Sequence, residues 1–161
     1  MNLGLYQLAN RIRQEMSDID YTLKRATAGL EKARQNNDDL YLDGIALNLH
    51  GFYSGIERLF ERIAVQLDEG LPHGANWHQS LLLQMADEVP NVRPAVISEE
   101  IRQWLDEYRG FRHIVRNVYT YKFDPSRMGM LTLKAPSLFE KFRKEMSAFA
   151  DFIESNAQDE S

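Results

Sequence analysis

Apolar residues recur every three or four positions through the first 68 residues of the chain, and no proline interrupts them. This spacing gives a helix one apolar face, so it predicts two long amphipathic helices, over residues 3–35 and about 39–68. A turn is expected at residues 36–39, where Asn and Asp favour a reversal of the chain. All five prolines lie beyond residue 71, which predicts shorter, interrupted helices in the rest of the chain.

Three further helices are expected in this second part, over residues 76–88, 98–122 and 137–155. Ser98 followed by two glutamates is typical of a helix N-terminus, and the Phe-Asp-Pro sequence at 123–125 is expected to end that helix at about Lys122. The polar residues from about 156 to 161 are expected to be frayed. No stretch alternates polar and apolar residues as a strand does. The sequence therefore predicts an all-α fold, an antiparallel helical bundle of about five helices, in a single domain covering residues 1–161.

The composition excludes several classes of protein. Hydrophobic residues make up 43% and charged residues 27% of the 161 positions, as in globular chains rather than disordered ones. The absence of cysteine excludes disulfides, thiolate metal sites and a cysteine nucleophile. His73 and His78 have no carboxylate cluster beside them in the sequence, so no metal and no other cofactor is expected. A basic-then-apolar leader and a membrane-spanning apolar run are both missing, so a cytoplasmic protein without a membrane partner is expected.

The helix expected over residues 98–122 has two unlike faces when its residues are placed at intervals of 100°. One face is apolar and is expected to lie against the core: Trp104, Tyr108, Phe111, Ile114, Val115, Val118 and Tyr121. The other face is polar: Arg109, Arg112, His113, Arg116, Asn117, Tyr119 and Thr120. Residues 109–127 carry a local charge of +4 in a chain of net charge −5, so the remainder carries −9.

Two interpretations of this polar face remain open. Most helices have a solvated polar face with no further role. However, no acid lies between residues 108 and 123 to offset the repulsion among the three arginines, which favours an anion-binding site. Arginine binds phosphate with two parallel hydrogen bonds, histidine transfers protons near neutral pH, and tyrosine stacks on a nucleobase. Arg109, Arg116 and Lys122 are therefore expected to bind an anionic ligand.

Residues 112–119, Arg-His-Ile-Val-Arg-Asn-Val-Tyr, resemble the signature of the HEPN superfamily and in particular its HepT-like branch. Residues 110–111, 121–125 and 49–58 are also similar to HepT-like chains. The resemblance implies a helical-bundle toxin that cleaves RNA without a metal and acts as a homodimer. It also implies a minimal nucleotidyltransferase antitoxin as partner, able to attach adenylyl groups to the tyrosine of the signature.

Carried over to this sequence, the resemblance assigns Arg112 to the family arginine, His113 to the polar position after it, and Tyr119 to the modifiable tyrosine. Asn117 stands where the family has its catalytic histidine, and an amide cannot transfer a proton near pH 7. Three outcomes stay open: His113 takes over proton transfer, Arg112 sustains slow cleavage, or the chain is a weakened member. The expected function is endoribonuclease activity on RNA. The alternative is a protein that binds nucleotide or RNA, or partners a nucleotidyltransferase, without cleaving RNA.

Other polar residues are given structural interpretations. Glu57, Arg58, Glu61 and Arg62 are expected on a solvated face, with an ion pair between Glu57 and an arginine of the signature as the less favoured alternative. His50 is expected to be half-buried, and the two tryptophans, Trp77 and Trp104, to be packing residues. Gly44, Gly51 and Gly55 indicate either a close approach of two helices or a flat surface where a second subunit docks.

Overall fold

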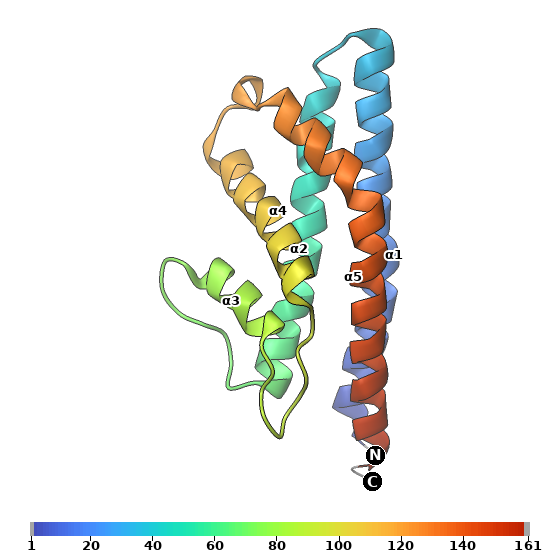
Figure 1. The fold of residues 1–161 in the computed structure, drawn as a ribbon, viewed down its shortest axis with the longest axis vertical. Helices are drawn as coiled ribbons and strands as arrows, with labels where there is room; N and C mark the ends of the chain where they lie inside the picture. The colour runs from blue at the N-terminus through green and yellow to red at the C-terminus, as the bar shows by residue number, and fades with distance from the viewer. Residues whose placement is uncertain (1, 160–161) are drawn as a thin grey trace.

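The computed structural model describes residues 2–159, and these form an all-α bundle with no β-strand in the described range (Figure 1). The elements, in order, are α1 (Leu3–Asn36), α2 (Tyr41–Leu67), α3 (Trp77–Ala86), α4 (Glu99–Asn117), the short 3-10 helix η1 (Thr120–Lys122) and α5 (Pro125–Asp159). The predicted fold class, with about five helices, is confirmed.

The bundle is built around α1, which runs antiparallel to both α2 and α5 along most of its length (Figure 1). α4 lies on the other side of α2, and α3 packs against both α2 and α4. An aromatic cluster joins three helices: the Phe52 ring of α2 lies 5.1 Å from that of Tyr108, 5.8 Å from that of Trp104 and 6.3 Å from that of Phe139. This core fixes α4 against α2, and therefore fixes the position of the signature residues.

Helices α1 and α2 approach closely because glycine lies at two of their contact points. A Cβ on Gly55 would lie 3.1 Å from Cγ1 of Ile19, and one on Gly29 would lie 2.9 Å from Cγ1 of Ile45. Both distances are tighter than ordinary packing allows. Of the two explanations for the glycines of α2, close helix approach therefore accounts for Gly55, whereas a Cβ on Gly44 would meet nothing within 4 Å.

Two predicted helix boundaries are wrong, and for the second of them the reason is a proline that begins a helix. α4 ends at Asn117 rather than at about Lys122, with Val118 extended and η1 following it. The last helix begins at Pro125 rather than at 137. Proline suits the first position of a helix because the missing N–H has no intrahelical partner there, and the carboxylate of Asp124 accepts from the backbone N–H of Ser126 at 3.0 Å.

Helix α5 continues through Pro136, although a proline inside a helix removes a hydrogen bond. The buried side chains of Thr132, Ala135 and Phe139 flank Pro136 and pack against the core, so burial outweighs the lost bond. Figure 1 shows α5 changing direction partway along its length, as expected at an internal proline.

The C-terminal prediction is also wrong over most of its range. Residues 156–159 are helical rather than frayed, and Ala157 is fully buried, with its carbonyl accepting from the N–H of Asn2 at 3.1 Å. Residues 160–161 lie outside the described range. Among the described helices, none combines the length and the apolar character that crossing a membrane requires.

Candidate functional site

The signature residues of α4 separate into two groups, one buried and one exposed. Arg112 is only 4% exposed, whereas His113, Arg116 and Asn117 are exposed on the other side of the helix. The prediction that Arg112 lies on an open polar face is therefore wrong. On the helical wheel Arg112 is next to the edge of the apolar face, and α2 packs over that edge.

Arg112 is held by a buried carboxylate on α2. Its Nη2 donates to Oε1 and Oε2 of Glu57 at 3.0 and 2.9 Å, and its Nη1 donates to Oγ of Ser54 at 3.3 Å. The Tyr53 ring lies against the guanidinium, with Cζ 4.8 Å from the ring centroid. The ion pair between Glu57 and a signature arginine, the less favoured alternative, is thus the observed arrangement, and the prediction that Glu57 is solvated is wrong.

A histidine from a third helix completes this cluster. Nδ1 of His78 on α3 lies 2.9 Å from Oε2 of Glu57 and 3.1 Å from Nη2 of Arg112. A carboxylate only accepts hydrogen bonds, so Nδ1 of His78 is the donor in its contact with Glu57. The Trp77 ring stacks on the imidazole at a centroid distance of 3.7 Å. Glu57 and Arg112 are buried, and the His78 side chain, 30% exposed, lies at their edge; we call the three residues the buried cluster.

The sequence did not predict that His78 lies at this site. The residue lies 34 positions from Arg112, and no spacing rule links the two. Burial within α2 and the charge of Glu57 raise the pKa of the neighbouring Glu61 carboxyl, and burial raises the pKa of Tyr53. Two groups beside the buried cluster, Tyr53 and Glu61, therefore ionise less readily than usual.

The exposed group of signature residues has its own contacts. Nδ2 of Asn117 donates to the carbonyl oxygen of His113 at 2.7 Å and lies 3.5 Å from Nδ1 of the same residue. Arg109 is half-buried and donates to Asp106 at 2.7 Å, so its charge is partly neutralised. Burial lowers the pKa of His50, which is half-buried as predicted, and the charges of Arg112 and Arg116 lower it further.

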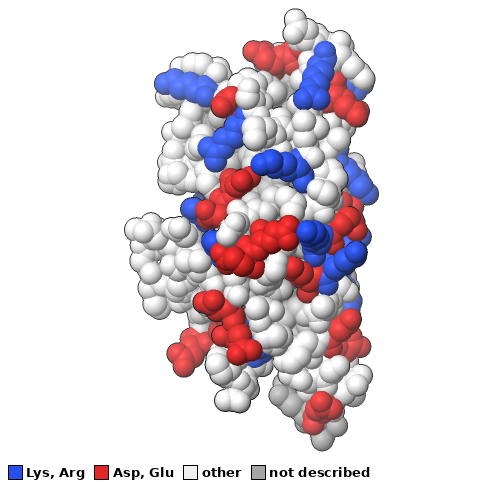
Figure 2. Space-filling view, in the orientation of Figure 1, with Lys and Arg blue, Asp and Glu red and all other residues white. Residues whose placement is uncertain are grey.

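Beyond α4, the aromatic residues of the segment are also exposed. Tyr119 is 73% and Tyr121 79% exposed, so the prediction that Tyr121 lies in the core is wrong. That prediction assumed a helix continuing to Lys122, and the end of α4 at Asn117 turns Tyr121 away from the core. On the face shown in Figure 2, Lys and Arg atoms prevail at the upper left, over η1 and the start of α5, whereas Asp and Glu atoms prevail in the lower part.

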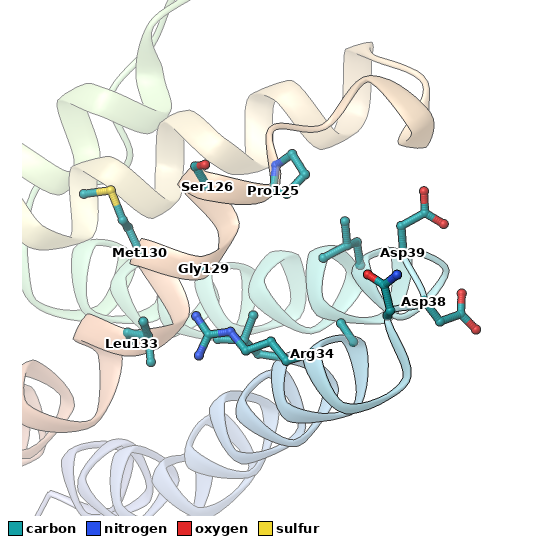
Figure 3. Close-up of a pocket in the computed structure, with 12 residues that line it drawn as sticks. Arg34, Asp38, Asp39, Pro125, Ser126, Gly129, Met130 and Leu133 are labelled. Carbon is teal, nitrogen blue, oxygen red and sulfur yellow. The ribbon is translucent and has the colours of Figure 1, made fainter.

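Two further features of the described residues bear on the chemistry. Within residues 2–159 there is no group of three or more His, Cys, Asp or Glu residues that could hold a metal ion. A groove lies between the end of α1, the α1–α2 turn and the start of α5; Arg34, Asp38, Asp39, Met130 and Leu133 are among its lining residues, and the Arg34 side chain points toward Leu133 (Figure 3). No signature residue from 109 to 122 lines this groove.

The fold and the site define a class of protein: an antiparallel helical bundle with a signature arginine anchored between helices and a basic exposed end. A family model described as HepT-like protein matches residues 44–153, which include the buried cluster and the whole signature. The chain therefore belongs to the HepT-like family. No curated protein and no solved structure shows a significant match to the chain.

Proposed function

We propose that this HepT-like protein is the toxin of a HEPN–nucleotidyltransferase toxin–antitoxin module and acts as a metal-independent endoribonuclease. The proposal includes a single domain covering the chain, a cytoplasmic location, a homodimer and a minimal nucleotidyltransferase as antitoxin. Family membership supports the class of protein. The observation that supports the chemistry is the hydrogen bonding of Arg112: Glu57 and Ser54 hold its guanidinium, but some of its N–H donors have no partner among the described residues.

Arginine has five N–H donors. In Arg112, Nη2 is bonded to Glu57 and Nη1 to Ser54, but Nε has no hydrogen-bond partner among the described residues, and the side chain as a whole is 5% exposed. A guanidinium held in this way stabilises the charge that develops on a phosphate during cleavage, without first having to be ordered. Arg116 and Lys122, neither of which forms an ion pair within the described range, would attract the RNA backbone.

Cleavage of RNA without a metal requires a base. The base removes the proton of a 2′-hydroxyl, the 2′-oxygen bonds to phosphorus, and the bond from phosphorus to the 5′-oxygen breaks as that oxygen takes up a proton. Asn117, at the position where the resemblance has the catalytic histidine, cannot accept the proton. His113 is exposed, lies one turn away and has an imidazole in contact with Asn117, so we assign proton transfer to His113.

The test is cleavage of single-stranded RNA in the presence of EDTA. Wild-type protein is expected to cleave the RNA, His113→Ala to lose about 10²-fold or more in rate, and Asn117→His to gain activity. Both positions are exposed, so the variants should unfold at the temperature of the wild type. No cleavage by either the wild type or Asn117→His would contradict the endoribonuclease proposal.

A second candidate is supported by a specific observation: the charge of Arg112 is paired with Glu57, and the Asn117 amide is engaged by its own helix. On this account the protein presents Tyr119 to a nucleotidyltransferase without cleaving RNA. Incubation with the antitoxin and ATP should then increase the mass of the wild type by one adenylyl group. Tyr119→Phe should abolish the increase and Tyr121→Phe, a control of similar exposure, should keep it. A mass increase that persists in Tyr119→Phe would contradict this candidate.

A further inference from the structure

Two tyrosine rings form an exposed pair just beyond the signature helix. Tyr119 and Tyr121 lie with ring planes only 10° apart and centroids 6.0 Å apart. They are the two most exposed of the large hydrophobic residues in the described part of the chain. Tyr119 is extended and immediately precedes η1, so the alternation of an extended chain followed by one tight turn puts both rings on one side of the backbone.

Among the aromatic residues of the described range these two are the most exposed, followed by Tyr21 at 59% and Tyr41 at 38%. Eight residues are Phe and two are Trp, and none of them is among the exposed large hydrophobics of the described range. A large ring left in water forfeits the hydrophobic free energy that burying it would provide. The fold therefore gains nothing in stability from the position of these two rings, and a ligand that covers them would recover the loss.

A cation lies beside both rings. Nζ of Lys122 is 6.0 Å from the centroid of the Tyr119 ring and 5.8 Å from that of the Tyr121 ring. Arg116 and Arg127, on either side of the segment in sequence, also form no ion pair with any described residue. Asp124 is the only acid between residues 108 and 128. The rings are thus set in a positively charged part of an otherwise acidic molecule, as Figure 2 shows at the end of α4.

We infer that Tyr119, Tyr121 and Lys122 form a platform on which a nucleobase of single-stranded RNA stacks, with Lys122 against the adjoining phosphate. Parallel exposed rings beside a cation are what recognition of a single strand requires, because the base offers its flat face and the backbone its charge. Bases within a duplex are already stacked on one another and cannot reach such a platform. The inference rests on the proposed function, since RNA is the ligand in both.

The platform also accounts for the first contact with RNA, which Arg112 alone cannot make. Arg112 is buried and its charge is paired, so it cannot be the first group that RNA meets. Base stacking at Tyr121 and phosphate contacts at Lys122 would hold the strand at the end of α4, beside the exposed His113. Tyr121 is therefore a binding residue in this account, with no part in proton transfer.

The experiment measures binding separately from cleavage. A fluorescently labelled oligonucleotide with 2′-O-methyl sugars has no free 2′-hydroxyl, so it can be bound but not cut, and its anisotropy reports binding. The variants are Tyr121→Ala, which removes the ring, Tyr121→Phe, which keeps it, and Tyr21→Ala, which removes an exposed tyrosine on α1 as a matched control. All three change exposed side chains, and circular dichroism checks that each variant is folded.

Stacking on an aromatic side chain contributes about 1–3 kcal/mol per base, so Tyr121→Ala should weaken binding of the single strand by about 5- to 150-fold. Tyr121→Phe and Tyr21→Ala should bind as the wild type does, and binding to a duplex of the same sequence should be the same for all four proteins. Wild-type affinity in Tyr121→Ala would overturn the inference, and so would an equal loss in Tyr21→Ala or an equal loss for the duplex. Since the probe cannot be cut, a failure here is distinct from a failure to cleave RNA.

Discussion

Two buried arginines, Arg93 and Arg112, are each paired with a carboxylate of α2 or its C-cap, but they differ in how many of their N–H donors are used. Arg93 is 3% and Arg112 4% exposed. Arg93 makes five hydrogen bonds, one for each of its donors: Nε and Nη2 to the two oxygens of Asp68, Nη1 to two carbonyls, and Nη2 to a third. Arg112 leaves Nε without a partner among the described residues.

The difference indicates a different role for each residue. Arg93 ties the loop between α3 and α4 to the end of α2, because the carbonyls it reaches belong to Gln84, Asp87 and Pro94. With every donor used, it has nothing to offer a ligand. Arg112 is anchored by one end of its guanidinium and has donors left at the other. Burial alone therefore does not separate the two arginines, whereas the number of unused donors does.

The largest expected effect comes from removing the carboxylate that pairs with Arg93. Asp68→Ala leaves a buried guanidinium without its counter-charge, which costs about 3–5 kcal/mol of the free energy of unfolding. RNA cleavage per folded molecule should not change, and Glu69→Ala, at the exposed neighbouring acid, should leave both properties unaltered. Chemical denaturation measures the stability, and a loss below about 1 kcal/mol would contradict the structural role of Arg93.

The corresponding change at the other arginine should separate stability from binding. Glu57→Gln keeps the shape of the side chain and one acceptor oxygen but removes the negative charge beside Arg112. We expect a loss of about 1–3 kcal/mol in stability, together with tighter binding of RNA, because the guanidinium is no longer neutralised. Asp68→Asn is the matched control and should lose stability with no gain in affinity. Equal affinities in the two variants would remove the distinction between the arginines.

A smaller effect is expected at His78, which donates from Nδ1 to Glu57. His78→Ala should cost about 1–2 kcal/mol of stability, since a buried carboxylate loses one donor. His78→Asn places an N–H at a similar distance from the backbone and should recover part of the loss. Thermal unfolding of the three proteins checks this order, and an Asn variant no more stable than the Ala variant would argue against the hydrogen bond.

The smallest effect is on the pH dependence of stability, through His50. Its native pKa is lowered from 6.5 by burial and by the arginine charges, so the unfolded chain binds a proton more readily than the native one as the pH falls below that value. Stability contributed by neutral His50 is therefore present above pH 6.5 and is lost on acidification until the native pKa is passed. His50→Gln should unfold with a shallower pH dependence between pH 7 and 5, and an unchanged slope would rule out this contribution.

The sequence predicts the long helices well because their apolar spacing is local information. The 3- and 4-residue recurrence of α1 and α2 appears directly in their buried faces, from Leu8 to Leu30 and from Ile45 to Ile63. Proline was less informative than expected. The same residue type begins α5 at Pro125 and lies inside it at Pro136, and tertiary packing rather than local preference decides between the two.

The site was harder to predict because its contacts join distant parts of the chain. The helical wheel placed Arg112 on the polar face and carried no information that α2 covers that side of the helix. Glu57 could be considered as its partner from charge alone, whereas His78 could not, since it lies on a helix that periodicity does not orient. The exposure of Tyr121 depends on α4 ending at Asn117, where no proline or glycine marks the end.

We propose that Arg112 stabilises the RNA phosphate during cleavage, whereas Arg93 stabilises only the fold. The same substitution at both positions tests this difference most directly. Arg112→Lys and Arg93→Lys each keep the positive charge and remove the forked donors. Cleavage of single-stranded RNA in EDTA is compared at a temperature at which circular dichroism shows both variants folded. We predict a loss of about 10²-fold in rate for Arg112→Lys and wild-type cleavage for Arg93→Lys. Equal rates in the two variants, or a greater loss in Arg93→Lys, would contradict the account.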